Sequence, residues 1–514
     1  MQNSTEMAWR TYSYIIICLV TYATSLPLTT LEKPLESDDH QETHKPNDAD
    51  IFTQIIASNE GIDQLLLQGD IAIRVVRSSL QCDNCKWDIS SNGKVPVPFT
   101  VSPGYTKSQL ALITAAMQEF ETLTCVDFVP KTNEKNVINI NNGNGCWSYI
   151  GRSGGVQQVS LSKQSCMVKG IIQHELNHVL GFVHEHVRSD RDQYVNVVKK
   201  NILPDSLGNF DIAVTNNLGL PYDYYSVMHY PRNAFSISPF LPTLITKPDP
   251  TIQIGQRYGL TNLDIAKINK LYNCDVCSTL LSDVNGTLFS PSYPSAYPDN
   301  ANCVWLIRIP SNQVSVQFIA FSLQTSQNCV SDYVKIYDGA TRSDPVLLDK
   351  ACGSLLLPPI TASSNLMLLE FVSNEGNTMT GFEATYSTVS CGGTYTSQSN
   401  SFSSPGYPVA YPPLTTCIWS IYAPVGFKIV LTINKIDVEY GLLCMYDSLT
   451  IYDGYNTTAP ILRCACGNTA VPNQISRGRS MLLVFSSDIS VQKKGFQASY
   501  TLSEYFGLLY HMVM

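Results

Sequence analysis

Three histidines and a glutamate lie close together in one short stretch of the chain. His174, Glu175 and His178 fall within five residues, and His184 follows after Gly181. Residues four apart on a helix share one face, so His174 and His178 can bind one metal ion through their imidazoles. Gly181 permits a sharp turn because it tolerates positive φ, and this turn brings His184 back as a third ligand. The pattern predicts a catalytic zinc site with one position open for water.

Glu175 directly follows the first histidine and can therefore reach a water molecule at the open position. A carboxylate in that place acts as a general base and then passes the proton to the leaving amine of a cleaved peptide. The alternative is that these residues are unrelated surface histidines, since a bare H-E-x-x-H occurs by chance. Gly181 and His184, both in register with the motif, favour the zinc interpretation.

Residues 226–230 form a second motif, Ser-Val-Met-His-Tyr, in which Met228 lies 44 residues beyond His184. In isolation this stretch is an ordinary apolar strand end. Beside the three histidines it resembles the Met-turn of the metzincins, which implies that Met228 packs beneath the metal without ligating it. With this turn and the stretch 174–185, residues 78–275 resemble the astacin family of zinc endopeptidases.

The astacin resemblance implies roles for several further residues. Tyr230 would be a switchable fifth zinc ligand that swings away to hydrogen-bond the developing oxyanion. Glu185 would help to anchor the processed N-terminus, and residues 156–161 would be the edge strand that binds extended substrate by antiparallel pairing. Cys82 and Cys85 resemble the additional N-terminal pair of hatching enzymes. The disulfides of the family carry over as Cys125–Cys274 and Cys146–Cys166.

The start of the chain has the features of a secretory signal peptide over residues 1–25, with Arg10, a short apolar core and a small-residue exit. A short buried helix is the alternative. Residues 26–77 begin as a polar, acidic leader and are expected to be a propeptide. Arg74 and Arg77 stand in R-x-x-R spacing, which suits a processing protease that cuts after Arg77. A basic patch on a strand fits that spacing equally well.

Asp70 ends the leader stretch Leu-Gln-Gly-Asp at residues 67–70, which resembles the Phe-x-Gly-Asp motif of astacin propeptides. The resemblance implies that Asp70 occupies the open zinc position in the zymogen and keeps the precursor inactive. Leu67 stands where the family motif has phenylalanine.

Helices and strands around the zinc motif must position it. A capping box followed by apolar residues at helical spacing predicts an amphipathic helix over 107–122. Residues 137–140 and 156–161 are expected to be strands. A second helix over 167–180, ended by Gly181, would carry the first two histidines.

The sequence beyond Cys274 is β-rich and repeats itself. Cysteines 26 and 23 residues apart in the first copy are matched by cysteines 26 and 22 apart in the second. These are two copies of one β-sandwich module of about 110 residues. They resemble CUB domains, at 277–388 and 391–502, with Cys464 left over and a tail at 503–514 to which we assign no function. The resemblance implies the disulfides Cys277–Cys303, Cys329–Cys352, Cys391–Cys417 and Cys444–Cys466.

Three acidic residues distinguish the second repeat, namely Glu439, Asp447 and Asp488. Many CUB domains bind calcium through acidic residues at such positions, and hard carboxylates suit that ion. The equivalent residues of the first repeat are Gln324, Asp332 and Asn374. Because two of the three charges are missing there, we expect calcium only in the second repeat, where it would shape loops that contact a basic group on a partner. The alternative is that all six are ordinary loop residues.

Composition and charge set the broad class of the protein. The chain has 514 residues, 44% of them hydrophobic, and about three domains are expected at this length. A net charge of −9, with no basic run, argues against nucleic acid as a partner. No apolar run reaches the roughly 18 residues of a membrane span. The 16 cysteines favour a disulfide framework in an exported protein, in which Asn285 and Asn456 are glycosylation acceptors.

The sequence therefore predicts a multidomain fold, in which an α+β metzincin protease domain is followed by two all-β CUB sandwiches. We expect a secreted zinc endopeptidase. Its architecture, with no growth-factor-like module between the repeats, is most similar to amphibian-type hatching enzymes, which implies egg-envelope proteins as substrates. One alternative is an astacin-like protease acting on extracellular matrix or growth-factor precursors. Another is an inert protease fold whose CUB modules bind partners, although His174, Glu175, His178, His184 and Tyr230 are intact.

Overall fold

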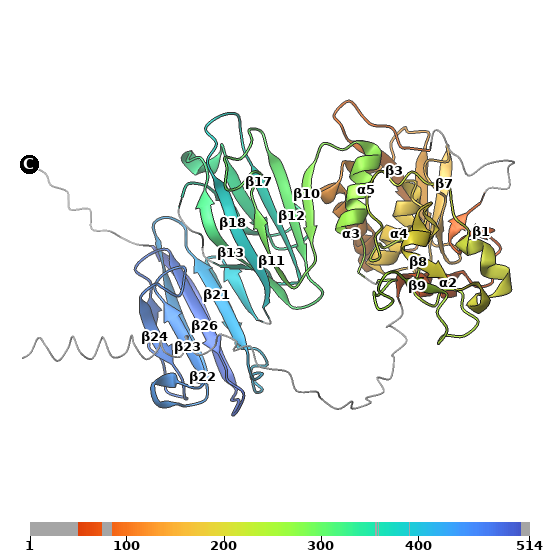
Figure 1. The fold of residues 1–514 in the computed structure, drawn as a ribbon. Coiled ribbons are helices and arrows are strands. Elements are labelled where there is room, and N and C mark those ends of the chain that lie inside the picture. The colour runs from red at the N-terminus through yellow and green to blue at the C-terminus, as the bar shows by residue number, and fades with distance from the viewer. Residues whose placement is uncertain are drawn as a thin grey trace, which may run out of the picture. The chain divides into compact units, whose positions relative to one another are not determined.

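A computed structural model describes residues 50–73, 85–256, 258–354, 357, 359–389 and 391–504. The predicted signal peptide, the processing site at Arg74 and Arg77, Cys82 and nearly all of the tail lie outside these residues. The chain divides into two compact units, and each is described by itself. The first holds the described part of the leader, residues 50–73, and the histidine motif, and the second holds most of the repeated region (Figure 1).

The first unit is built on a seven-stranded sheet with the strand order β1-β2-β6-β7-β5-β3-β4. Strands β4, β3, β5 and β7 are parallel to one another, whereas β6 is antiparallel to β7. The strands are β1 (Leu66–Leu67), β2 (Ile71–Ala72), β3 (Val95–Val101), β4 (Val126–Pro130), β5 (Val137–Asn141), β6 (Cys146–Ser148) and β7 (Val156–Leu161). A separate two-stranded sheet pairs β8 (Val195–Val197) with β9 (Leu244–Thr246).

In the described part of this unit four α-helices accompany the sheet, namely α2 (Ile51–Asn59), α3 (Lys107–Leu123), α4 (Lys169–Val179) and α5 (Asn262–Tyr272). The sequence predicted two of them, α3 and α4, to within two residues at each end. The capping box at Thr106 and Gln109 is present at the start of α3, and Ile113, Met117 and Phe120 lie on its buried face. Short 3-10 helices connect the remaining chain as η2 (Glu185–Val187), η3 (Arg191–Gln193), η4 (Lys199–Asn201) and η5 (Pro204–Phe210). None of the helices in the described residues is long and apolar enough to cross a membrane.

The predicted edge strand at residues 156–161 lies inside the sheet, which corrects the sequence interpretation. Strand β7 pairs with β5 on one side and with β6 on the other. A hairpin that contains Gly151, Gly154 and Gly155, all with positive φ, folds β6 back along β7. The leader then adds to the outer side of β6, where Ile71 pairs with Ser148. The backbone next to the leader is therefore that of β6.

Each repeat forms a β-sandwich of a five-stranded and a four-stranded sheet, as predicted. In the first, β10 (Cys277–Leu281), β12 (Asn302–Arg308), β17 (Leu366–Val372), β14 (Tyr333–Tyr337) and β15 (Val346–Ala351) face β11 (Asn285–Phe289), β18 (Gly381–Val389), β13 (Gln313–Ser322) and β16 (Ile360–Thr361). In the second, β19 (Gly392–Tyr395), β21 (Thr416–Tyr422), β26 (Ser480–Ser486), β23 (Ser448–Tyr452) and β24 (Ile461–Ala465) face β20 (Ser399–Ser403), β27 (Gly495–Glu504), β22 (Phe427–Asp437) and β25 (Gln474–Ile475). Single helical turns are η6 (Gln327–Cys329) and η7 (Leu442–Cys444).

The two repeats carry a serine and a glycine at equivalent positions that shape the same part of each sandwich. The hydroxyl of Ser290 accepts a hydrogen bond from the Phe382 amide, and Ser404 does the same for Phe496. The preceding glycines, Gly381 and Gly495, have φ near +85° and leave no room for a Cβ beside these hydroxyls. Each glycine and serine pair therefore fixes the same strand junction in both sandwiches.

Disulfides join six cysteine pairs in the described residues: Cys125–Cys274, Cys146–Cys166, Cys277–Cys303, Cys329–Cys352, Cys391–Cys417 and Cys444–Cys466. Cys85 also belongs to a disulfide. Cys464, in β24, is a free thiol. The two glycosylation triplets are in the sandwiches, where Asn285 is exposed and Asn456 is partly buried in a turn.

Candidate metal centre

Helix α4 carries the first two histidines into the interior of the domain. Every residue of α4 from Gly170 to Val179 is buried, which includes His174, Glu175 and His178. The helix ends at Val179 with Leu180 as its C-cap, and Gly181 turns the chain with φ +103°. His184 then stands at the start of η2 and is also buried. This is the helix, turn and third histidine that the motif predicts.

The three imidazoles converge on the carboxylate of Asp70 from the leader. Asp70 Oδ2 lies 2.9 Å from His174 Nε2 and 3.2 Å from His184 Nε2. Its other oxygen, Oδ1, lies 3.4 Å from His178 Nε2. The potential ligand atoms of the four residues lie within 4.8 Å of one another, and all four residues are buried. Asp70 is held there because its carbonyl accepts a hydrogen bond from Ser148 in β6.

The Nδ1 atom of each imidazole, which points away from Asp70, faces an oxygen that can only accept a hydrogen bond. The partners are Val227 O for His174 at 2.8 Å, Phe182 O for His178 at 2.7 Å and Gln68 Oε1 for His184 at 2.8 Å. Each Nδ1 therefore carries the proton and donates it, which leaves each Nε2 with a lone pair. Burial lowers the pKa of His184 to about 3, so this ring is neutral near pH 7.

The inner nitrogens form an arrangement that fits a zinc ion. His174 Nε2 and His184 Nε2 are 3.2 Å apart, and both face the Asp70 carboxylate. Lone pairs at this spacing repel one another unless a cation lies between them. Tetrahedral zinc with Zn–N bonds of about 2.0–2.1 Å would separate two nitrogens by about 3.3 Å. His178 Nε2 and Asp70 Oδ1 have no hydrogen-bond partner among the described residues, as expected of metal-facing atoms.

Glu175 is buried beside this centre and is available for proton transfer. Both of its carboxylate oxygens lack a hydrogen-bond partner among the described residues. Burial, together with the charge of Asp70, raises the pKa of Glu175 well above its ordinary value. A raised pKa favours the protonated carboxyl, so Glu175 is suited to taking up a proton.

The predicted Met-turn is tied to both α5 and η2. Asp264 in α5 accepts hydrogen bonds from the Ser226 hydroxyl at 2.6 Å and from the Val227 amide at 3.0 Å. The Met228 side chain is buried, and its carbonyl accepts from the Glu185 amide at 3.0 Å. Asp264 was not assigned a role from the sequence, although it stands in a Thr-x-x-Asp capping box that marks the start of α5.

Tyr230 is fully buried and is held by the leader. Its hydroxyl donates to the Gln68 carbonyl at 2.5 Å. Its ring stacks between those of Phe52, in α2, and His186, with ring centroids 3.8 Å and 3.6 Å away. Gln68 thus contacts both Tyr230 and His184. Neither Gln68 nor Phe52 was assigned a role from the sequence, although Gln68 lies inside the leader motif.

Glu185 belongs to a buried ionic network. Its carboxylate accepts from Lys267 Nζ at 2.6 Å, from Arg188 Nη1 at 3.0 Å and from the Asp223 amide at 2.9 Å. The processed N-terminus lies outside the described residues, so the predicted anchoring role of Glu185 stays a prediction.

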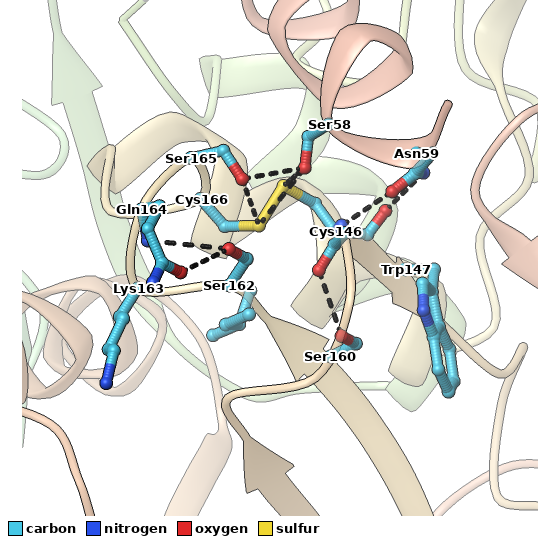
Figure 2. The surroundings of a disulfide bond; sticks show 12 residues. Ser58, Asn59, Cys146, Trp147, Ser160, Ser162, Lys163, Gln164, Ser165 and Cys166 are labelled. Carbon is cyan, nitrogen blue, oxygen red and sulfur yellow. Dashed lines mark hydrogen bonds between the residues drawn. A yellow bond between two sulfur atoms is a disulfide. The ribbon is translucent and has the colours of Figure 1, made fainter. Parts of the chain in front are cut away.

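The end of the leader helix α2 docks on the backbone of β6 (Figure 2). Asn59 Nδ2 donates to Cys146 O at 2.7 Å, and the Cys146 amide donates to Asn59 Oδ1 at 2.7 Å. Asn59 also donates to Gly69 O at 2.9 Å, next to Asp70. Ser58 Oγ lies 2.8 Å from Ser165 Oγ, beside the Cys146–Cys166 disulfide. The Asn59 carboxamide therefore makes the two hydrogen bonds that a paired peptide strand would make.

The acidic residues Glu439, Asp447 and Asp488 also meet in the structure, with carboxylate oxygens within 4.8 Å of one another. Asp447 is buried and accepts from Tyr411 OH at 2.5 Å and from the Asp488 amide at 2.7 Å. Glu439 Oε2 is buried without a hydrogen-bond partner among the described residues. Burial and the charges of its two neighbours raise the pKa of Glu439.

The first sandwich has the same framework without two of the charges. Tyr297 OH donates to Asp332, whose second oxygen accepts from the Asn374 amide at 2.9 Å. The side-chain oxygens of Gln324 and Asn374 are buried without hydrogen-bond partners in the described part of the chain. The two frameworks thus differ in charge rather than in shape.

Comparison with known proteins places these domains in families. Residues 84–273 match the Astacin family of peptidases, and residues 277–386 and 391–500 match the CUB domain. The chain is similar to Embryonic protein UVS.2 of Xenopus laevis, with 47% identity over 506 residues that cover 95% of this chain and 98% of that protein. It is also 47% identical to an astacin-like metalloendopeptidase of Gallus gallus, over 70% of this chain and 88% of that protein.

A solved structure with 47% sequence identity is that of high choriolytic enzyme 1, a hatching enzyme zinc-protease from Oryzias latipes. The match covers 38% of this chain and 100% of the choriolytic enzyme chain, with a TM-score of 0.37. The relatives found by sequence show that the chain belongs to the astacin family of metalloendopeptidases. It is an astacin protease domain followed by two CUB domains.

Proposed function

We propose that this protein is a secreted zinc endopeptidase that is made as an inactive precursor and that digests egg-envelope proteins. The observation that carries the catalytic part is the convergence of three imidazole lone pairs on one point beside the buried Glu175 carboxylate. The three histidines would hold the zinc ion.

Zinc bound by His174, His178 and His184 would supply Lewis acidity, which activates water and polarises the scissile carbonyl. Glu175 takes the proton from the attacking water and delivers it to the leaving amine. Tyr230, once the leader has left, is free to donate its hydroxyl hydrogen bond to the developing oxyanion. Once the leader has left, the backbone of β6 binds the substrate as an antiparallel strand, in the place that Asn59 takes in the precursor.

The leader keeps the precursor inactive by filling this site. Asp70 takes the open position at the three histidines, Gln68 binds Tyr230, and Asn59 covers the backbone of Cys146. Every substrate-binding group of the proposed mechanism is thereby occupied by a leader atom. A cut after Arg77 by a processing protease would release the leader, and the two arginines in R-x-x-R spacing support that site.

Egg-envelope protein is the proposed substrate because of the domain architecture and the relatives. Two CUB domains follow the protease without a growth-factor-like module between them. A relative that matches nearly the whole chain is named an embryonic protein.

The substrate proposal can be tested with isolated egg envelopes. We expect the activated enzyme to solubilise envelopes at concentrations that leave a collagen-rich matrix and a growth-factor precursor intact, and the Glu175→Gln variant to solubilise nothing. If the enzyme left the envelopes intact and digested the matrix or the precursor, the egg-envelope proposal would be wrong and the digested protein would be the better candidate. Transcripts in the hatching gland before hatching are expected as well.

We further propose that the second CUB domain binds one calcium ion through Glu439, Asp447 and Asp488. Three carboxylates at close range support this, as does the Glu439 oxygen that has no hydrogen-bond partner among the residues the structure describes, because Ca²⁺ prefers hard oxygen ligands. The bound ion would hold these loops in a shape that contacts a basic group on a partner. In the first CUB domain two neutral amides replace carboxylates, so the electrostatic attraction for a cation is weaker there.

Calorimetric titration of the full chain with calcium tests this assignment. We expect one tight site in the wild type, no tight site in Asp447→Asn, and an unchanged site in the matched Asp332→Asn variant of the first domain. Two equivalent sites, or a site lost in Asp332→Asn and kept in Asp447→Asn, would contradict it.

A further inference from the structure

The leader places one aromatic side chain deep in the protease domain, next to a candidate metal ligand. Phe52 of α2 is only 2% exposed. Its ring stacks on Tyr230 at 3.8 Å and meets the His184 ring edge-on at 5.5 Å. On a third side it meets Phe235 at 5.8 Å. The leader thus places a phenylalanine side chain beside the position where the scissile bond is proposed to lie.

The seat of Phe52 is built by the protease itself. We define the aromatic seat as the rings of His184, Phe210, Tyr230 and Phe235. Phe210 contacts Tyr230 at 5.8 Å and Phe235 at 6.3 Å, and Tyr230 contacts Phe235 at 5.9 Å. None of these contacts involves the leader, so they can persist after its removal.

Phe235 is fixed by its backbone. It has φ +50°, a conformation that bulky residues rarely adopt, and its carbonyl accepts a hydrogen bond from the Leu203 amide at 2.9 Å. Next to it, Ser236 pairs with Ile202 in a β-bridge. Residues held in such unusual conformations are often found at ligand sites. The Phe235 ring is therefore presented toward the seat by a rigid segment.

We propose that, in the mature enzyme, the aromatic seat binds an aromatic side chain of the substrate and sets the cleavage preference of the protease. This inference rests on the proposed function, because the seat opens only when the leader leaves. The ring centroids of Phe52 and His184, a candidate zinc ligand, are 5.5 Å apart. One extended residue spans about 3.3–3.6 Å, so we place the selected side chain within two residues of the scissile bond.

The chemistry of the seat favours aromatic over charged or small side chains. Its rings offer stacked and edge-on contacts to a planar side chain, which add to the burial of apolar surface. They offer no counter-charge, so a buried Lys or Asp side chain would stay unpaired. Full burial of a phenylalanine corresponds to roughly 10- to 100-fold in binding relative to an alanine. We expect a preference of that order in kcat/KM.

Quenched peptides that differ at one position can measure this preference in the activated full-length enzyme. We expect Phe, Tyr or Trp within two residues of the cut to raise kcat/KM about 10- to 100-fold over Ala. Phe235→Ala should lower kcat/KM for the aromatic peptides about tenfold and leave the Ala peptides within about twofold. Phe240→Ala is the matched control, because Phe240 lies on the same segment and is 92% exposed. If Phe235→Ala does not fold, Phe235→Leu keeps an apolar side chain and most of the volume, and it should still reduce the aromatic preference because the ring is lost.

A binding measurement separates this proposal from the proposed function. A peptide of residues 50–73 and its Phe52→Ala form are titrated calorimetrically into activated, zinc-loaded Glu175→Gln enzyme, which does not consume them. We expect the Phe52→Ala peptide to bind roughly 10- to 100-fold more weakly. Equal binding of both peptides would refute the proposal that the aromatic seat binds an aromatic side chain. Equal cleavage of aromatic and Ala peptides by an enzyme that digests casein would refute it as well. If the wild type left casein intact, the proposed function would fail, and the peptide titration would still decide the seat.

Discussion

Replacing Asn59 with alanine should loosen the leader and give the uncleaved precursor measurable activity. Asn59 makes two hydrogen bonds to the Cys146 backbone, each of 2.7 Å, and one of 2.9 Å to Gly69. Cys146 is fully buried, so truncation leaves its amide and carbonyl without these partners. The same two groups are those that a substrate strand would use.

The expected size of this effect follows from the hydrogen bonds that are lost. A buried backbone group left without its partner costs about 1–3 kcal/mol. Because Asn59 is only partly buried, water can enter and replace part of each bond, and the two groups together should cost about 2–4 kcal/mol. This corresponds to a rise of roughly 30- to 1,000-fold in the fraction of precursor with an open site.

The assay is peptide hydrolysis by a precursor that carries Arg77→Ala, so that processing cannot contribute. The Asn59→Ala form should show a basal rate higher by that factor, with the rate of the cleaved enzyme as the ceiling. Glu60→Ala is the matched control, because Glu60 is the next residue and its side chain is exposed. An Asn59→Ala precursor as silent as the Glu60→Ala precursor would refute the reasoning.

Two further changes probe the leader and the buried network. Asp70→Ala should make the uncleaved chain active, because the open position is freed; a silent variant precursor whose cleaved product works would show that the leader blocks by bulk alone. Burial and the charge of Asp264 raise the pKa of Asp223 from 3.8 to about 7. Between these two pKa values the folded state binds one proton more than the unfolded state. The free energy of unfolding should therefore fall as pH rises from about 4 to 7, by at most about 4 kcal/mol. Asp223→Asn should flatten this decline in urea midpoints at pH 5 and 8, and an unchanged slope would contradict the assignment.

The parts of the site that sequence could predict depend on local spacing. His174 and His178 fall on one face of α4 for reasons of helix geometry, and Gly181 provides the turn that returns His184. The sandwich repeats were recognisable because the cysteine spacings of the two copies, 26 and 23 against 26 and 22, nearly coincide, as expected when one framework is used twice. Leader residue Asp70 could be found through its short motif.

The parts that were missed depend on contacts between distant segments. The position of β6 outside β7 follows from how a glycine-rich hairpin folds back, which strand periodicity does not report. Leu67 stands where the family motif has an aromatic residue, and Phe52 of α2 stacks on Tyr230. No local pattern connects residue 52 with residue 230. Asn59 was overlooked for the same reason, since its partner Cys146 lies 87 residues away.

The central claim is that this chain is a zinc endopeptidase in which Glu175 moves the proton. Its most direct test is to measure the zinc content and the casein-hydrolysis rate of activated wild type and Glu175→Gln side by side. We predict about one zinc per chain in both proteins, because Glu175 is not among the proposed ligands. The hydrolysis rate of the variant should be lower by at least about 100-fold. A variant with full zinc content and near wild-type turnover would contradict the account.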